Sequence, residues 1–322
     1  MEIFKHDSNI KFLRWRRVSI VISTLLVLGS ILAISTRGLN YALDFTGGIL
    51  VEAKYEQPVD IKDVRSALSA AGFDHAVVQS VGGAREVSIR LQANAGKGEQ
   101  GSSEADKKRN DQVAGEVLKA LQAKRSDVTK TRTDFVGPQV GKELKSSGAT
   151  AVIFVILGIM IYIGLRFEWR FAIAAIASEF HDTLITIGFF ALTYREFDIT
   201  VLASVLAVVG YSINDKVVVF DRVRELFRST RKGDPEDILN RAINSTLSRT
   251  IITSAFTGMT MIALFFIGGP AVHGFALTMI IGIIIGTLSS IFFANPILLW
   301  LGVSKKDLMP VTRDNAELAR RP

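Results

Sequence analysis

Long apolar runs and polar segments alternate along this chain. The first apolar run covers residues 18–35 and follows residues 1–17, which end in several basic residues. Each run, the first included, is long enough to cross a hydrocarbon core of about 30 Å as a helix. The pattern predicts an α-helical polytopic membrane protein with six transmembrane helices. The five later runs cover residues 149–165, 171–194, 199–220, 249–267 and 272–301.

The polar segment between the first two runs, residues 36–147, has the periodicities of a soluble α+β domain. A Gly-, Ser- and Glu-rich stretch at 93–107 is predicted to be a flexible insertion. The remaining order, βαββαβ, is that of a ferredoxin-like domain. Period-two patterning predicts strands at 48–54, 75–81, 86–91 and 132–137, and helical spacing predicts helices at 60–71 and 111–125.

Basic residues predict the orientation of the spans. The connector 166–170, the predicted loop 221–248 and the tail 302–322 are rich in Arg and Lys, whereas 195–198 and 268–271 are poor in them. The positive-inside rule then puts both termini in the cytoplasm and the domain 36–147 in the periplasm. A cleaved signal peptide at 18–35 is the alternative, but a signal core is usually shorter, ~7–15 residues.

Composition excludes several kinds of function. The chain has no Cys, which rules out a disulfide framework and thiolate chemistry. Its formal net charge is +7, but acidic and basic residues nearly balance within 36–147, so no nucleic-acid surface is expected. There is no phosphate-binding loop motif and no hydrolase triad to argue from. We therefore expect no cofactor and no enzymatic activity.

A carboxylate inside the fourth apolar run is the first candidate for a functional site. Asp215 follows Asn214 within a predicted span, where a charged side chain costs ~2.5–3.5 kcal/mol and marks function by default. Ser204 and Tyr211 are spaced to share its helix face. Lys216 cannot face its neighbour Asp215 and is predicted to snorkel toward the inner interface. The alternative is that Asp215 is only a structural ion pair or cap.

The fifth run offers a partner for this carboxylate. Arg249 begins it, and hydroxyl side chains that include Thr253 follow at helical spacing. Because the fourth and fifth runs are consecutive and antiparallel, Asp215 and Arg249 are expected to meet in the inner half of the membrane. An arginine and desolvation act oppositely on a carboxylate, so such a group can bind and release protons. Alternatively, Arg249 is an interfacial anchor and the hydroxyls bond to their own helix.

The third and sixth runs carry further polar and small residues. Glu179, His181 and Asp182 lie inside the third run, and the two acids share a face. A packed polar support for the proton site is favoured over a metal site, because there is only one His and no second ligand cluster. In the sixth run, Pro296 is expected to kink or end the helix. Gly274, Thr278, Gly282 and Gly286 form a small-residue ridge for close helix packing.

Three motifs together resemble the SecF members of the SecD/SecF family, accessory subunits of the bacterial Sec protein translocase. They are LDFTGG at 43–48, GYSIND at 210–215 continued by VFDRVRE at 219–225, and LSRTIITS at 247–254. The resemblance covers essentially the whole chain and implies an RND-like half that forms a heterodimer with SecD in the bacterial inner membrane. It also implies proton-motive-force-driven support of preprotein export at the SecYEG channel, with YajC as a further candidate partner.

By motif match, the resemblance assigns proton coupling to Asp215 and Arg249, with Tyr211, Asn214, Thr253 and Asp182 as polar support. Lys216 departs from the motif, where a small or apolar residue usually follows the Asp. Asp44, Gly47 and Gly48 are expected to be structural: an entry turn at the membrane edge with the backbone freedom of glycine.

Two other functions compete with this hypothesis. A passive membrane scaffold has no need of a carboxylate and a polar stripe inside the bilayer. A half-size RND-type exporter of small molecules would be expected to have larger exported domains, whereas the single compact domain here leaves little room for a ligand pocket.

Overall fold

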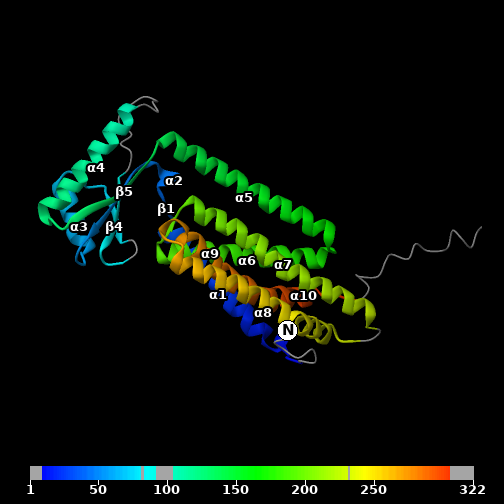
Figure 1. Cartoon of the computed structure of the whole chain (residues 1–322). Helices are drawn as coiled ribbons and strands as arrows, with labels where there is room; N and C mark the ends of the chain where they lie inside the picture. Colours follow the sequence, from blue (N-terminus) through cyan, green and yellow to red (C-terminus); the bar gives the residue numbers. More distant parts are fainter. Residues whose placement is uncertain (1–8, 81–82, 92–103, 231–232, 305–322) are drawn as a thin grey trace, which may run out of the picture. The chain divides into compact units, whose positions relative to one another are not determined.

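A computed structural model describes residues 9–80, 83–91, 104–230 and 233–304 of the chain (Figure 1). The chain divides into two compact units: a helical one, formed by residues 1–40, 152–196 and 200–322, and a mixed one, formed by residues 41–151 and 197–199. The predicted fold class, a six-span α-helical membrane protein with one ferredoxin-like domain, is confirmed. Six helices are long and apolar enough to cross a membrane.

The mixed unit contains a four-stranded antiparallel sheet with the order β3-β4-β2-β5. The central strand β2 (Gly48–Tyr55) pairs with β4 (Glu86–Leu91) and β5 (Val128–Val136), and β3 (Val77–Ser80) lies at the edge. This order, with β2 in the centre and a βαββαβ sequence of elements, is the one expected of a ferredoxin-like domain.

Two helices cover the sheet and complete its core. They are α3 (Ile61–Ala70), whose N-cap Asp60 accepts a hydrogen bond from the Lys62 amide at 2.9 Å, and α4 (Glu104–Lys124). Alternate residues of β2 point inward, as a half-buried strand requires. With α3 and α4 they bury a core that includes Val51, Leu68, Ile89 and Val117.

The predicted elements of this domain differ from the observed ones mainly at their ends. Helix α4 begins at Glu104, seven residues before the predicted start at 111, so the last part of the predicted insertion 93–107 is helical. Strand β5 begins at Val128 rather than at 132, because its polar residues pair along β2. Residues 92–103, which make up most of the insertion, lie outside the described residues.

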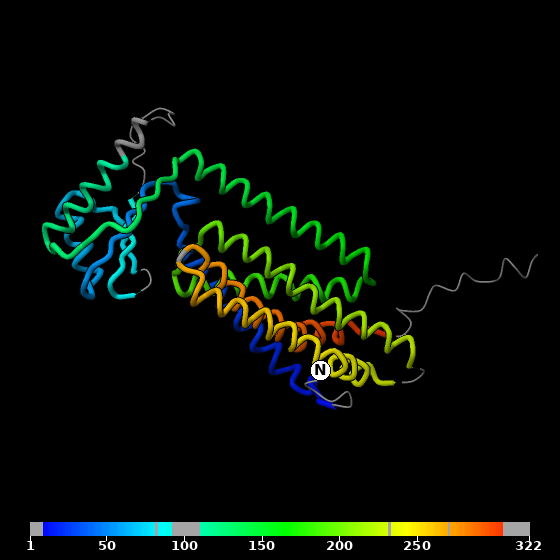
Figure 2. The backbone as a smooth tube through the Cα atoms, in the orientation of Figure 1, coloured from blue at the N-terminus to red at the C-terminus, as the bar shows by residue number. Residues whose placement is uncertain are grey.

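The helical unit is a bundle of long helices that run side by side (Figures 1 and 2). Helix α6 packs on α1 and α9, and α8 packs on α9. A short 3-10 helix, η1 (Phe12–Trp15), precedes α1, and a π-helical turn, η2 (Ser290–Ala294), follows α9. The long helices are α1 (Arg16–Arg37), α5 (Pro138–Arg166), α6 (Trp169–Thr193), α7 (Ile199–Ser229), α8 (Pro235–Ile267) and α9 (Pro270–Ser289), with α10 (Asn295–Trp300) after the π turn.

The predicted loop 221–248 is wrong as a structural assignment. Helix α7 continues to Ser229 and α8 already begins at Pro235, so most of this segment is helical. The helices extend past the apolar runs because their polar ends still bury side chains such as Phe227, Leu239 and Ile243 in the bundle core. A hydropathy run marks only the part of a helix that is apolar all round, whereas an amphipathic end is stabilised by packing on one face.

The sixth span contains a local irregularity near the predicted one. Helix α9 is followed by the π-helical turn Ser290–Ala294, and α10 then continues through Pro296 to Trp300. Proline lacks an amide hydrogen and so removes one helical hydrogen bond, and the Asn295 side chain before it donates to the Ser290 carbonyl of the π turn at 2.7 Å. Pro296 therefore accompanies a change of helix type and does not end the span.

Two further short elements complete the description. The two-residue strands β1 (Asn40–Tyr41) and β6 (Glu196–Phe197) pair with each other. Between β1 and β2, a single helical turn, α2 (Leu43–Thr46), ends at Gly47 and Gly48, whose φ angles are +67° and +129°. A Cβ at Gly47 would lie 3.0 Å from the Pro138 Cα atom, so this turn packs against the start of α5.

We expect Leu68→Ala to destabilise the ferredoxin-like domain by about 2–5 kcal/mol, because Leu68 is fully buried between α3 and the sheet. Hydrogen exchange of the β2 amides in the full chain measures the free energy of opening. The exposed neighbour Ser66→Ala is the matched control and is expected to change it by less than about 0.5 kcal/mol. Equal effects of the two substitutions would show that this face of α3 is not part of the core.

Candidate functional site in the helical bundle

Asp215 lies on α7, a helix that is predicted to span a membrane, and its ionisable side chain is buried within the bundle. Its residue is 3% exposed, and its Oδ2 atom has no hydrogen-bond partner in the structure. The preceding residue, Asn214, is exposed. Buried carboxylate oxygens normally accept hydrogen bonds, and an exception calls for an explanation such as a catalytic or exchange role. Asp215 is therefore the candidate centre of the site.

Arg249 lies on α8, near enough for its charge to act on Asp215. The guanidinium is exposed in the single chain, and no ion pair joins it to Asp215 in the structure. The two residues that the sequence predicts to meet are therefore neighbours without direct contact.

The hydroxyl residues on α8 divide into two groups. Thr253 donates to the carbonyl oxygens of Arg249 and Thr250, both at 3.0 Å, and Thr257 bonds to its own helix in the same way. Ser254 instead lies 2.7 Å from the Thr287 hydroxyl and accepts a hydrogen bond from the Tyr211 hydroxyl at 3.3 Å. The hydrogen bonds that link α7, α8 and α9 near Asp215 therefore come from Tyr211 and Ser254, whereas Thr253 donates only within α8.

Helix α9 approaches α7 at the level of this site through its small residues. An added Cβ at Gly286 would lie 2.7 Å from the Ser212 Oγ atom, and one at Gly282 would overlap Val208. Both residues belong to the predicted small-residue ridge, and Thr278 of the same ridge is fully buried. The interpretation of this ridge as a packing surface agrees with the structure, because any side chain there would push α9 away from α7.

Lys216 does not snorkel, and that prediction is wrong. Its side chain is fully buried and donates to Glu179 and to Asp182 on α6, both at 2.8 Å, and to Ser212 at 2.9 Å. Snorkelling would expose the ammonium group, whereas two carboxylates on the adjacent span compensate its charge inside the bundle. Adjacent residues on a helix point in different directions, so the hydrogen bonds of Lys216 go to α6 and to Ser212 and not to Asp215, although the charges of both Lys216 and Arg249 act on Asp215.

Asp182 accepts a full set of hydrogen bonds in this cluster. Its Oδ2 atom receives Lys216 and the hydroxyls of Ser212 and Ser289, the last two at 2.6 Å, and its Oδ1 atom lies 2.8 Å from His181 Nδ1. The packed, hydrogen-bonded role expected of Asp182 agrees with this geometry. Sequence analysis did not identify Lys216, Glu179, Ser212 and Ser289 as one network. The signal it could have used is opposite charge in adjacent spans, Glu179 and Asp182 in one and Lys216 in the next.

Asp44 is connected to the helix that carries the candidate site. From the helical turn α2, its Oδ2 atom accepts a hydrogen bond from the Ile199 amide, the first residue of α7, at 3.1 Å. The first amides of a helix lack intrahelical partners, and an acidic side chain there stabilises the helix start. Asp44 was expected to be structural, and its hydrogen bond to the start of α7 is compatible with such a role.

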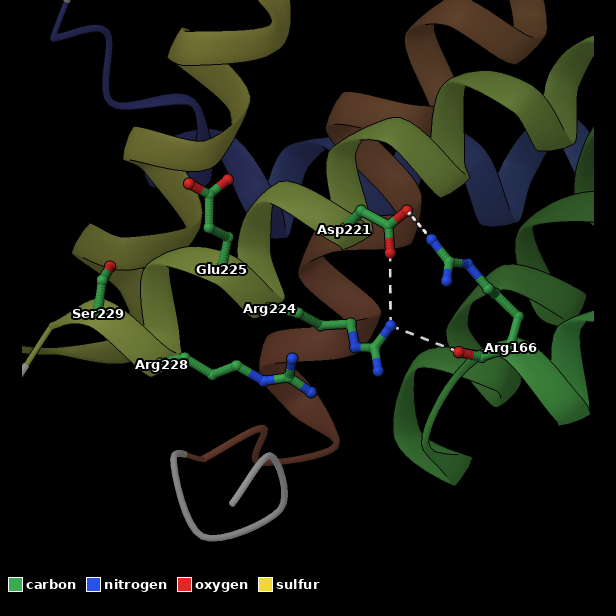
Figure 3. Close-up of a pocket in the computed structure, with 6 residues that line it drawn as sticks. All are labelled: Arg166, Asp221, Arg224, Glu225, Arg228 and Ser229. Atoms are coloured by element: carbon green, nitrogen blue, oxygen red, sulfur yellow. Dashed lines mark hydrogen bonds and ion pairs between the residues drawn. The ribbon is translucent and has the colours of Figure 1, made fainter. Parts of the chain in front are cut away.

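The inner end of α7 is held by a group of ion pairs that surround a pocket of about 560 Å³ (Figure 3). Asp221 binds Arg166 at 2.6 Å and Arg224 at 3.4 Å, and Arg224 also binds Glu168 at 3.0 Å. These bonds join α7 to the end of α5 and the start of α6. Because the Arg166 and Asp221 side chains are 47% and 36% exposed, each pair contributes little to stability.

Figure 3 shows that Asp221 lies between the two arginines, whereas Arg228 and Glu225 lie farther along α7 on the rim of the pocket. We therefore interpret the run of charges after the span as an anchor that fixes the C-terminal end of α7.

We expect Lys216→Met to destabilise the helical unit by about 3–5 kcal/mol, because it leaves buried carboxylates without their cation. Asp221→Asn on the same helix is the matched control: it breaks partly exposed ion pairs and is expected to cost less than about 1 kcal/mol. Thermal unfolding of the full chain in detergent compares the two. A Lys216→Met variant as stable as the control would contradict the role of the buried cluster.

Taken with the six spans, these features define a class: polytopic membrane proteins that carry compensated charges and buried carboxylate oxygens without hydrogen-bond partners, that of Asp215 among them, inside a helical bundle. Residues 116–304 match the family described as protein export membrane protein SecD/SecF, C-terminal, and residues 32–59 match the SecD/SecF GG motif. The chain belongs to the SecD/SecF family, and the relatives it matches are SecF subunits.

The similarity to those relatives extends over the whole chain. The protein translocase subunit SecF of Vibrio alginolyticus is 42% identical over 100% of this chain and 99% of its own length. The SecF subunit of Pseudomonas aeruginosa is also 42% identical, over 94% of each chain. The crystal structure of SecDF, a translocon-associated membrane protein from Thermus thermophilus, superposes with a TM-score of 0.80 at 32% identity. It covers 92% of this chain, which spans only 39% of that longer chain.

Proposed function

We propose that this protein is the SecF subunit of a Sec translocase accessory complex, which pairs with SecD and uses the proton-motive force to promote preprotein export. The observation that carries the proposal is Asp215, a buried carboxylate with an unpartnered oxygen in a membrane span. A subunit that draws on a proton gradient needs a group that takes up and releases protons within the bilayer. No catalytic chemistry is assigned to the chain.

The pairing with SecD is supported by the solved relative. That protein is titled SecDF. The match covers 92% of this chain but only 39% of the longer SecDF chain. The remainder of the longer chain supplies the surface against which this chain would assemble. Helix α8 supports the same idea, because little of its apolar window is buried within this chain and Arg249 is exposed. An arginine that faces lipid is costly, so a partner subunit or a hydrated path next to α8 would stabilise it.

The proposed coupling depends on two opposing effects on Asp215: burial favours its protonated form, and the charge of Arg249 favours its ionised form. Protonation of Asp215 therefore removes the attraction between Asp215 and Arg249. A change of one charge in a site of low dielectric alters the packing preference between α7 and α8. The Tyr211–Ser254–Thr287 hydroxyls, which join α7, α8 and α9, would carry this change to the neighbouring helix.

SecYEG and a translocating preprotein are the proposed partners beyond SecD, with YajC as an additional membrane component. The proposed location is the bacterial inner membrane with both termini in the cytoplasm and the ferredoxin-like domain in the periplasm. The basic residues at the inner end of α7, Arg222, Arg224 and Arg228, support this orientation.

A passive scaffold is the second candidate function, and the buried ion cluster of Lys216 is the observation that favours it. This cluster has a structural explanation that needs no proton exchange. It does not explain the unpartnered oxygen of Asp215, which a scaffold would satisfy or replace. A half-size exporter of small molecules receives less support, because the single compact exported domain leaves little room for a ligand pocket.

We expect Asp215→Asn to abolish proton-dependent support of preprotein export while complex formation with SecD is retained, because the amide keeps the shape but cannot exchange a proton. Asp221→Asn on the same helix is the control, since it makes the same chemical change in an exposed ion pair. Export into membrane vesicles with an imposed proton gradient measures the effect, and co-purification measures assembly. Normal gradient-dependent export by Asp215→Asn would exclude Asp215 as the proton carrier.

Reporter fusions test the proposed orientation. A fusion at Gly233, between α7 and α8, is expected to report the cytoplasmic side, and one at Gly98 the periplasmic side. Gly98 lies outside the described residues, within the predicted insertion, where an added domain is tolerated best. The same compartment at both sites would be incompatible with the assigned topology.

A further inference from the structure

The cluster around Lys216 does not balance its own charge. It contains two carboxylates, Glu179 and Asp182, and one ammonium group, all nine-tenths or more buried. With both acids ionised, one negative charge would remain without a partner. An uncompensated buried charge costs several kcal/mol, and such a site instead binds a proton and becomes neutral.

The hydrogen bonds identify which acid takes the proton. All four contacts of Asp182 come from donors or from the His181 ring nitrogen, which is the pattern of an ionised carboxylate. Glu179 accepts only from Lys216, through Oε2, and its Oε1 atom has no hydrogen-bond partner. An ionised carboxylate with a bare oxygen is costly to bury, and protonation removes that charge, although the new O–H donor at Oε1 then has no acceptor. The free position for a proton is therefore on Glu179.

His181 is the other group that could neutralise the cluster, and its surroundings disfavour this. Its ring stacks on Phe293 with centroids 4.1 Å apart, and its Nε2 atom has no hydrogen-bond partner. An imidazolium ion would present an unsatisfied N–H donor to this apolar contact. A neutral ring that donates from Nδ1 to Asp182 leaves only an acceptor unpaired, which costs less.

The elements packed around Glu179 supply no other balancing charge. On α7 the charged groups are Lys216 and Asp215. The charge of Lys216 acts on Asp215 as well, followed by that of Arg249 on α8, but the hydrogen bonds of Lys216 go to Glu179, Asp182 and Ser212. The membrane-embedded parts of α1 and α9 contribute serines to this region, Ser289 on α9 among them, and no charged side chain. The charge count for the cluster is therefore two acids and one cation.

We propose that Glu179, Asp182 and Lys216 form a second proton-binding site, distinct from Asp215, in which Glu179 holds one resident proton. This proton keeps the α6–α7 contact neutral. The ionised Asp182 then holds Lys216 on the α6 side of α7, and Asp215 remains as the carboxylate available for exchange. The inference about Glu179 is independent of export, and only its relation to Asp215 rests on the proposed function.

Infrared spectroscopy of the full chain in lipid nanodiscs, with carboxyl-labelled glutamate, tests the site. At neutral pH the wild type is expected to show the carbonyl band of a protonated glutamic acid, shifted by the label. Glu179→Gln is expected to lose this band. A labelled band that persists in Glu179→Gln would overturn the proposal, as would its absence from the wild type.

Asp182→Asn provides the test of the charge count. It leaves one acid and one cation, so Glu179 is expected to ionise and the labelled band to disappear although Glu179 is still present. A purely structural Glu179 would not respond in this way, and a retained band would contradict the count. If Asp182→Asn does not fold, the comparison of wild type with Glu179→Gln still decides whether Glu179 is protonated.

Export separates this proposal from the function proposed above. Because a glutamine resembles the protonated carboxyl, Glu179→Gln is expected to support export as the wild type does, whereas Asp215→Asn loses it. Loss of export in Glu179→Gln would show that its proton is exchanged and not resident. Normal export in Asp215→Asn would instead remove Asp215 from proton coupling and leave the infrared result on Glu179 unaffected.

Discussion

The ammonium group of Lys216 is the constraint on which the arrangement of the bundle depends. A fully buried lysine in a membrane span is tolerated only where acids and hydroxyls surround it, and here they come from α6, α7 and α9. The three helices must therefore keep one register relative to one another. That register in turn decides which face of α7 is closed by the cluster and which face, with Asp215, is directed toward α8.

Helix α7 connects the motifs that are far apart in the sequence. Asp44, from the segment before the ferredoxin-like sheet, caps its first residue, and the Arg166–Asp221–Arg224 ion pairs hold its inner end. Between these anchors the small residues of α9 allow a close approach at Gly282 and Gly286. A rod held at both ends and packed along its length transmits a local change of charge better than a loop does, because packed helices shift as units.

Much of the fold follows from one-dimensional patterns. Apolar runs of sufficient length predict six spans. Period-two and helical spacing predict the βαββαβ domain, because an element that buries one face has apolar residues at the period of that element. The errors occur where a partner distant in sequence changes the outcome. The segment 221–248 is largely helical because Phe227, Leu239 and Ile243 are buried in the bundle core, and Lys216 is buried because two carboxylates on α6 compensate its charge.

The sequence by itself determined the class of protein, the number of spans, the ferredoxin-like order and the presence of a carboxylate where a bilayer disfavours it. Only the tertiary structure decided how the charges are shared. Lys216 follows Asp215 directly, and nothing in their order reveals that one faces α6 and the other comes under the influence of α8. The partners Glu179 and Asp182 are more than thirty residues away, and the strength of a buried charge depends on the dielectric and donors that packing brings around it.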